Sequence, residues 1–139
     1  MNGKPLIYYT IKAAILSKVC DKVIVYTDSS QIAKIAKSYG AEVPFKRPNK
    51  ISGSLATTEE TLKLCLFQAE KFYKTKFDIC VFLACTNIFR KVSWITEAVN
   101  NLKKDKKLDS SFSVHQLYKH FWTIKNHKQK KVCEWMKKY

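Results

Sequence analysis

The sequence predicts an α/β protein with an open, mostly parallel sheet and helices on both faces. Two observations carry this prediction. Amphipathic helical patterns alternate with short apolar stretches, and the stretch 78–85 ("DICVFLAC") is apolar at almost every position. Strands buried on both faces of a parallel sheet have such a composition, and helices alternating with strands are typical of parallel sheets. With 139 residues, the chain is long enough for one hydrophobic core.

The first third of the chain contains two predicted helices and two predicted strands. Apolar residues at helical spacing predict a helix that starts near Pro5. The stretch 22–27 ("KVIVYT") is rich in β-branched residues, which is typical of a strand. Capping residues at 28–30 predict the start of a second helix, which ends before Gly40. The stretch 41–45 ("AEVPF") then predicts a short extended piece.

Two more helices are predicted beyond a polar loop at 46–56. Thr57 and Glu60 have the T-x-x-E spacing of a capping box, and apolar residues follow at helical spacing. After the strand 78–85, Ser93 is expected to cap the fourth helix.

Two further strands are predicted near the end of the chain, at 110–116 and 121–125. The lysine-rich tail beyond them shows no clear element. We therefore expect one domain over residues 1–126 and a disordered tail over 127–139.

The charge of the chain is strongly positive, with 26 Lys and Arg against 11 Asp and Glu, a formal net charge of +15. Only Arg47 and Arg90 among these basic residues are arginines. Arginine reads bases and phosphates bidentately, whereas lysine is a hydrated point charge. The composition therefore favours a solvated lysine-rich surface over specific nucleic-acid binding.

The cysteine pattern and the apolar runs indicate where the protein resides. Five cysteines form no C-x-x-C pair, and no Cys/His spacing indicates a zinc site. No signal peptide is visible, and no apolar run approaches the roughly 20 residues that span a bilayer. We expect a cytoplasmic protein that is not embedded in a membrane.

Candidate ligand residues follow from the predicted sheet, because open parallel sheets bind ligands beyond the carboxyl ends of their strands. Both arginines lie there. Arg47 and Arg90 are each interpreted either as an anion or nucleobase contact or as an exposed surface charge. Asp28 could hold a ribose hydroxyl or a metal, although a helix cap is the favoured interpretation. Thr57 is explained by capping, yet the N–H groups of its helix also offer a ligand site.

The usual apparatus for phosphates and metals is not visible. There is no G-x-G-x-x-G and no Walker A loop, and the chain has only three glycines. No tight acidic pair stands at a predicted strand end, where Mg²⁺ would be held between carboxylates and phosphates.

Several stretches carry a family resemblance. The stretches "NGKPLIYYTIKAAILSK", "DKVIVYTDSSQIAKIAKSYGAEVPFKRP", "ACTNIFR" and "SSFSVHQLYKHFWTIK" resemble the CMP-N-acetylneuraminate synthetases, or acylneuraminate cytidylyltransferases. The resemblance runs from about residue 2 to about residue 126. It implies a nucleotide-diphospho-sugar transferase fold of the α/β type.

The resemblance also implies an activity, the transfer of CMP from CTP to an acidic nonulosonate sugar such as a sialic acid, with release of pyrophosphate. The sugar hydroxyl attacks the α-phosphorus directly, and Mg²⁺ and cationic side chains stabilise the developing charge. The implied partners are CTP and the sugar, with a homo-oligomer or a complementing chain to complete the enzyme.

The resemblance assigns binding roles to six residues and catalysis or metal binding to none. It implies nucleotide binding by Arg47, Ala56, Thr57 and Thr58. It implies a sugar or phosphate contact by Thr86 and Arg90.

The chain also departs from the family pattern. The glutamine of the segment L-Q-P-T-S-P-L-R is Ala84, its prolines are Cys85 and Ile88, and an aspartate of the preceding loop is Ser54. The family's opening strand and basic phosphate loop would lie before Gly3, and its metal carboxylates beyond the last residue. We therefore expect a fragment with weak or no activity alone. The alternative is a non-catalytic binding or interaction module in which a partner strand completes the sheet.

Overall fold

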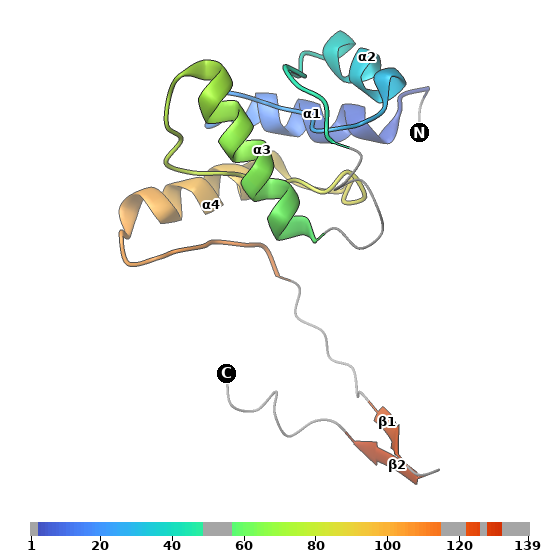
Figure 1. The fold of residues 1–139 in the computed structure, drawn as a ribbon. Helices are drawn as coiled ribbons and strands as arrows, with labels where there is room; N and C mark the ends of the chain where they lie inside the picture. The colour runs from blue at the N-terminus through green and yellow to red at the C-terminus, as the bar shows by residue number, and fades with distance from the viewer. Residues whose placement is uncertain (1–2, 49–56, 115–121, 126–127, 132–139) are drawn as a thin grey trace.

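The computed structural model describes residues 3–48, 57–114, 122–125 and 128–131. Within them the chain forms four helices and two strands (Figure 1). These elements are α1 (Leu6–Ser17), α2 (Ser30–Ser38), α3 (Thr58–Tyr73), α4 (Val92–Lys104), β1 (Trp122–Lys125) and β2 (Lys128–Lys131).

The first two helices are confirmed, with one correction at a cap. Pro5 stands at the N-cap of α1. Before α2, Ser29 Oγ accepts a hydrogen bond from the Ile32 N–H at 3.3 Å. The favoured capping role of Asp28 is therefore wrong, because the chain becomes helical one residue later than that role requires. Gly40 follows the end of α2 with a φ of 93°, as its predicted position implies.

The capping box of α3 is confirmed in both directions. The Glu60 N–H donates to Thr57 Oγ1 at 3.2 Å, and the Thr57 N–H donates to Glu60 Oε2 at 3.3 Å. The predicted cap of α4 is wrong, because Lys91 occupies the N-cap position and makes no side-chain cap bond. Ser93 already lies inside the helix, whereas a capping residue needs an extended backbone.

The predicted strands at 22–27 and 41–45 lie side by side and run parallel, with α2 between them in the chain. The Glu42 N–H donates to the Val23 carbonyl at 2.8 Å, and the Val25 N–H donates to the Glu42 carbonyl at 3.0 Å. These bonds form one parallel bridge between Ile24 and Glu42. Parallel pairing is thus present at one position of the described residues, and the wider sheet stays a prediction.

The remaining predicted strands have mixed outcomes. Residues 78–85 and 110–114 form no strand, and 115–116 lie outside the described residues. The strand predicted at 121–125 is confirmed as β1, which pairs antiparallel with β2. Because β2 lies in the tail, the expectation of no element there is wrong, whereas the division into domain and tail stays a prediction.

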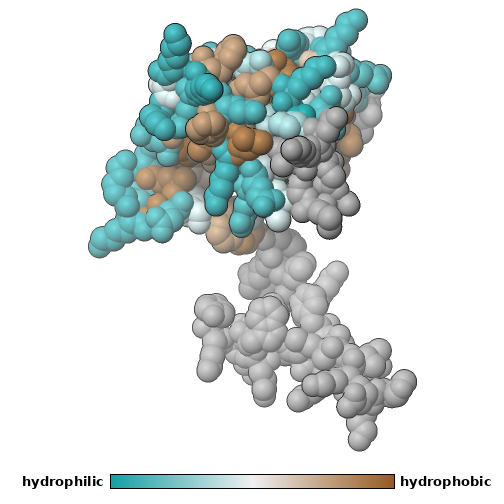
Figure 2. Space-filling model, viewed as in Figure 1, coloured by the Kyte–Doolittle hydropathy of each residue, from teal (hydrophilic) through white to brown (hydrophobic). Residues whose placement is uncertain are grey.

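The hydrophobic core gathers where α1 and α2 meet the first two extended segments. Its buried members are Ile11, Ala36 and Ala41, and Val23 and Val25 pack against them. Ile11 is the one large side chain below 2% exposure among the described residues. Hydrophilic residues cover much of the face seen in Figure 2, with apolar patches between them.

Side-chain hydrogen bonds tie the helices around the extended segments. Tyr26 Oη donates to Gln68 Oε1 of α3 at 2.8 Å, and Thr96 Oγ1 of α4 donates to the Ser17 carbonyl of α1 at 3.3 Å. In Figure 1, α3 crosses in front of the segments 22–27 and 78–84. These contacts connect the segments to α3 and connect α1 to α4.

Candidate functional site

The extended segments end on a common side of the molecule. In Figure 1 the segments 22–27 and 78–84 run in the same direction and end on the right of the view. The Arg47 N–H donates to the Thr27 carbonyl at 3.1 Å, which places Arg47 at this edge. The candidate residues from the strand ends therefore come from neighbouring parts of the fold.

Arg47 is half-buried and lies within electrostatic reach of Tyr26. Burial raises the pKa of Tyr26, the nearby Cys65 adds to this, and the positive charge of Arg47 opposes both. The positive charge of Arg47 thus acts at the same edge as the Tyr26 hydroxyl. A guanidinium at this edge suits recognition of a phosphate or carboxylate group of a ligand.

A second cation at this edge is Lys46, which the sequence analysis did not single out. Lys46 Nζ donates to Ser30 Oγ at the start of α2, at 2.9 Å. Its position directly before Arg47 in the sequence could have identified it as a candidate. Asp28 is exposed at the end of the first segment and is the carboxylate of this group of residues.

Three candidate residues, Ala56, Thr57 and Thr58, lie at or just before the start of α3. The Thr57 hydroxyl is engaged in the capping box, and Thr58 is exposed as the first residue of the helix. Glu59 and Glu60 lie in the first turn, where their charges complement the helix dipole and oppose a bound anion. A hydroxyl contact to a base therefore fits this helix start better than a phosphate contact. Ala56 lies outside the described residues.

Thr86 and Arg90 lie together in the loop after the segment 78–84. Thr86 is exposed. Arg90 Nη2 donates to the Ala84 carbonyl at 3.0 Å, which folds the guanidinium back onto the segment. Arg90 Nη1 is buried and makes no hydrogen bond within the described part of the chain. Burial lowers the pKa of Arg90 and Cys85 opposes this, so an anion that pairs with Nη1 would relieve an unfavourable state.

A hollow of about 600 Å³ lies beside this loop, against α4 and the segment 110–114. Asn87 and Phe89 of the loop line it, together with Trp94 and Asn101 of α4. Aromatic rings and amides together suit contact with a polar molecule such as a sugar.

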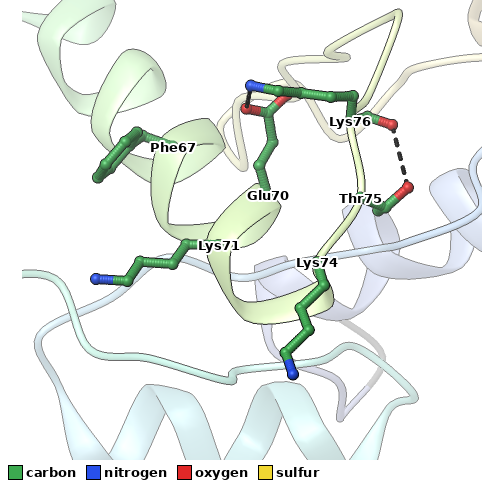
Figure 3. Close-up of a pocket in the computed structure, with 6 residues that line it drawn as sticks. All are labelled: Phe67, Glu70, Lys71, Lys74, Thr75 and Lys76. Atoms are coloured by element: carbon green, nitrogen blue, oxygen red, sulfur yellow. Dashed lines mark hydrogen bonds and ion pairs between the residues drawn. The ribbon is translucent and has the colours of Figure 1, made fainter.

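A second hollow, of about 450 Å³, lies at the carboxyl end of α3 (Figure 3). Lys76 Nζ pairs with Glu70 Oε2 at 2.7 Å, whereas Lys71 and Lys74 extend away from this pair (Figure 3). The carboxyl end of a helix carries partial negative charge, which disfavours a polyphosphate. None of the predicted site residues lines this hollow.

A divalent metal does not fit the described residues. No group of three or more His, Cys, Asp or Glu side chains gathers within the ranges that the structure describes. The candidate edge offers arginine, lysine and threonine, whereas Mg²⁺ prefers carboxylate oxygens. Among the helices described, none is both long enough and apolar enough to cross a membrane.

Comparison with known proteins gives a family match over nearly the whole chain. The model of the cytidylyltransferase family matches residues 1–136. A CMP-N,N'-diacetyllegionaminic acid synthase of Legionella pneumophila is 39% identical over 99 residues, which cover 71% of this chain and 42% of the relative.

Two further relatives carry related names. An N-acylneuraminate cytidylyltransferase of Escherichia coli is 41% identical over 96 residues, covering 69% of this chain and 22% of the relative. A pseudaminic acid cytidylyltransferase of Campylobacter jejuni is 39% identical over 56 residues, covering 40% of this chain and 24% of the relative. The chain matches less than half the length of each of these three relatives.

Proposed function

Since this chain belongs to the cytidylyltransferase family, we propose that it forms the substrate-binding part of an enzyme that transfers CMP from CTP to an acidic nonulosonate sugar. The names of the three relatives refer to diacetyllegionaminic acid, N-acylneuraminate and pseudaminic acid. An α/β fold of the nucleotidyltransferase type follows from family membership. The complete parallel sheet is part of this proposal.

The observation that carries the proposal is the buried Arg90 Nη1 without a partner in the described residues. A buried guanidinium N–H that lacks an acceptor is costly, and phosphate and carboxylate oxygens are its preferred partners. Both substrates of the proposed reaction carry such oxygens. Thr86, exposed in the same loop, is proposed to contact the same group.

Nucleotide binding is proposed at the neighbouring edge. Arg47 lies within electrostatic reach of Tyr26, and the stretch that leads into α3 contains Ala56, Thr57 and Thr58. We assign Arg47 to the charged part of CTP. The carboxylates in the first turn of α3 repel a phosphate, so we assign the threonines at this helix start to the base of CTP.

In the proposed reaction a sugar hydroxyl oxygen forms a bond to the α-phosphorus of CTP, and the bond to the pyrophosphate oxygen breaks. The hydroxyl proton passes to water, and pyrophosphate leaves. Cationic side chains stabilise the negative charge that develops on the phosphate oxygens. Arg47 and Arg90 are the residues of this chain suited to that role. Mg²⁺ is the family's expected cofactor, but the described residues do not fit it. Weak or no turnover by the chain alone is therefore proposed.

The test separates binding from turnover. Calorimetric titration with CTP is expected to show binding that Arg47→Met and Arg90→Met each weaken about tenfold, since a charge-assisted contact is worth about 1.5–3 kcal/mol. Lys12→Met and Lys34→Met remove exposed charges on α1 and α2, outside the site, and serve as matched controls. Equal affinities for all five proteins would contradict the assignment.

A CMP-sugar synthesis assay with CTP, Mg²⁺ and each of the three sugar acids tests the activity. Turnover well above background would contradict the proposed inactivity of the chain alone. If CTP does not bind at all, the alternative of a non-catalytic interaction module that reuses the fold becomes the better account.

A further inference from the structure

We propose that the outward face of α3 docks on the surface of an anionic lipid bilayer. Phe67 would enter the interface between headgroups and acyl chains, and Lys63, Lys71 and Lys74 would lie at the level of the phosphates. We name these four residues the lysine–phenylalanine stripe. The inference rests on the described side chains of α3 and does not depend on the proposed function.

Phe67 points away from the core. It lies two positions before Ala69, the buried residue of α3, and two positions correspond to about 200° of rotation around a helix. The side chain of Phe67 is 64% exposed, the largest value for a large apolar residue in the four described helices. A single exposed apolar residue is common on protein surfaces. The neighbours of Phe67 therefore decide what its exposure means.

Lysines surround Phe67 on the same face. Lys63 and Lys71 lie one turn before and one turn after it, a spacing that places side chains on one side of a helix. Phe67 and Lys71 project to the same side of α3 in Figure 3, and Lys74 follows at the carboxyl end. The three lysines are exposed, and their ammonium groups form no hydrogen bond or ion pair within the described residues. The face thus presents unpaired positive charges around one apolar ring.

The carboxylates of α3 do not cancel these charges. Glu70 is paired with Lys76 at 2.7 Å. Glu60 accepts a hydrogen bond from the Thr57 N–H in the capping box at the helix start. Glu59 lies in the first turn, where the helix dipole stabilises its charge. The positive potential of the stripe is therefore strongest over the carboxyl half of the helix.

A hollow beside the ring leaves room for a lipid headgroup. The hollow of about 450 Å³ at the carboxyl end of α3 has Phe67, Lys71 and Lys74 among its lining residues. The helix end itself disfavours a polyphosphate, but a phospholipid headgroup carries a single phosphate. Because Lys71 and Lys74 extend away from the helix, their ammonium groups can meet such a phosphate at a distance from the last carbonyls (Figure 3).

This combination suits a bilayer better than a protein or a nucleic acid. The cores of protein interfaces are depleted in lysine and contain aromatic residues packed at the density of a protein interior. Single-stranded nucleic acids bind in basic grooves, commonly with arginine, whereas the stripe lies on an outward helix face and contains no arginine.

Lysine and phenylalanine have complementary roles at a bilayer surface. Lysine stems lie along apolar surface while their ammonium groups stay among the phosphates, and an aromatic ring enters the interface. Each lysine near an anionic leaflet raises the affinity about fivefold, and salt weakens this attraction. Three lysines and one ring therefore predict weak, reversible docking that depends on anionic lipid.

The test is binding of the full chain to vesicles, measured by co-sedimentation. Vesicles of phosphatidylcholine alone are compared with vesicles that contain about one third phosphatidylglycerol, at an ionic strength of about 0.1 M. We expect at least tenfold tighter binding to the anionic vesicles, and a loss of binding as the salt concentration rises.

Two pairs of substitutions separate the stripe from the overall charge. Lys63→Gln combined with Lys71→Gln removes two charges from the stripe and is expected to weaken binding at least tenfold. Lys12→Gln combined with Lys34→Gln removes two exposed charges on α1 and α2 and should weaken binding less than about threefold. The two double variants have the same net charge, so a difference between them reports the position of the lysines.

A second pair tests the ring. Phe67→Gln is expected to weaken binding to the anionic vesicles about tenfold, because it removes the apolar side chain that enters the interface. Phe112→Gln, at a position that is 76% exposed outside α3, should change binding less than about twofold. All substituted residues are exposed, and circular dichroism checks that each variant keeps its helices.

Four outcomes would overturn the proposal. The chain could bind neither kind of vesicle, or both kinds equally. Equal weakening by the two double lysine variants would assign the binding to the overall charge. Binding of a single-stranded oligonucleotide or a polyglutamate peptide that depends on Phe67, without binding to vesicles, would assign the stripe to a nucleic acid or an acidic protein instead.

Discussion

The Tyr73 hydroxyl donates to Glu42 Oε2 at 2.6 Å, which joins the last residue of α3 to the parallel bridge of the first two segments. Glu42 Oε1 accepts from Lys22 Nζ at 3.1 Å, and Lys22 lies over the Tyr73 ring at 4.6 Å from its centroid. Three residues far apart in the chain thus form one polar cluster. This cluster fixes the carboxyl end of α3 over the segments 22–27 and 41–47.

Tyr73→Phe is expected to lower the free energy of unfolding by about 1 kcal/mol. The change removes a hydrogen bond to a charged acceptor but leaves the ring in place, and the partial exposure of Glu42 keeps the effect at the low end for such bonds. Urea unfolding measures it. Tyr39→Phe, on a ring that packs against Tyr8, is the control and should change stability by less than about 0.5 kcal/mol.

The contribution of this cluster depends on pH at both extremes. The Tyr73 hydrogen bond, followed by Lys22, lowers the pKa of Glu42. Stabilisation by Glu42 is therefore present above its ordinary pKa of about 4.3 and is lost as pH falls through the lower folded pKa. Burial, and after it the hydrogen bond to the Glu42 carboxylate, raises the pKa of Tyr73 to about 12. The stabilisation by Tyr73 is therefore lost as pH rises towards that value.

The stability difference between wild type and Tyr73→Phe should be constant near neutral pH and shrink below about pH 4. A difference that stays constant down to about pH 2 would exclude the Glu42 contact as its source.

Thr57→Ala is expected to cost about 1 kcal/mol, because it removes the side-chain acceptor of the capping box. Thr58→Ala is the matched control, with an effect on stability below about 0.5 kcal/mol. Thermal unfolding followed by circular dichroism measures both. If Thr58 contacts the nucleotide as proposed, Thr58→Ala weakens CTP binding without a loss of stability.

Gly40→Ala is expected to destabilise the protein by about 1–3 kcal/mol. The backbone φ of 93° is unfavourable for alanine, and the added Cβ would lie 3.2 Å from Ile15 Cδ1. Gly3→Ala is a control for the backbone cost alone, since φ there is 65° and nothing lies within 4 Å of the added atom. Denaturant unfolding should show the larger loss for Gly40→Ala. Equal losses would show that the contact with Ile15 relaxes without cost.

The sequence predicted the helices well because their signals are local. Periodic apolar residues and the Thr57–Glu60 spacing lie within a few residues of the structure that they specify. Capping residues were predicted at 28–30, and the structure selects Ser29 over the favoured Asp28, whereas the cap predicted at Ser93 lies two positions earlier, at Lys91. The backbone conformation decides between such neighbouring residues. Strand pairing depends on distant partners, so periodicity could not show that the parallel pairing of the described residues is a single bridge between Ile24 and Glu42.

The candidate site was predicted in part. The strand-end rule placed Arg47 and Arg90 at the ends of extended segments, as the structure has them. It could not show that Arg90 Nη1 is buried without a partner, or that Tyr26 reaches Gln68, since both depend on how α3 and the loop pack. The strand β2, with three lysines in four residues, has no alternating pattern that would have revealed it.

The core cluster that contains Ile11 and Ala36 also draws in residues from Ile7 to Val43 and none from α3 or α4. Contacts within so short a stretch close small loops, which favours rapid formation. The first third of the chain is thus expected to act as a folding unit of its own. Its amides would gain protection first during refolding, and α3 and α4 would open at lower free energy than the unit on which they rest.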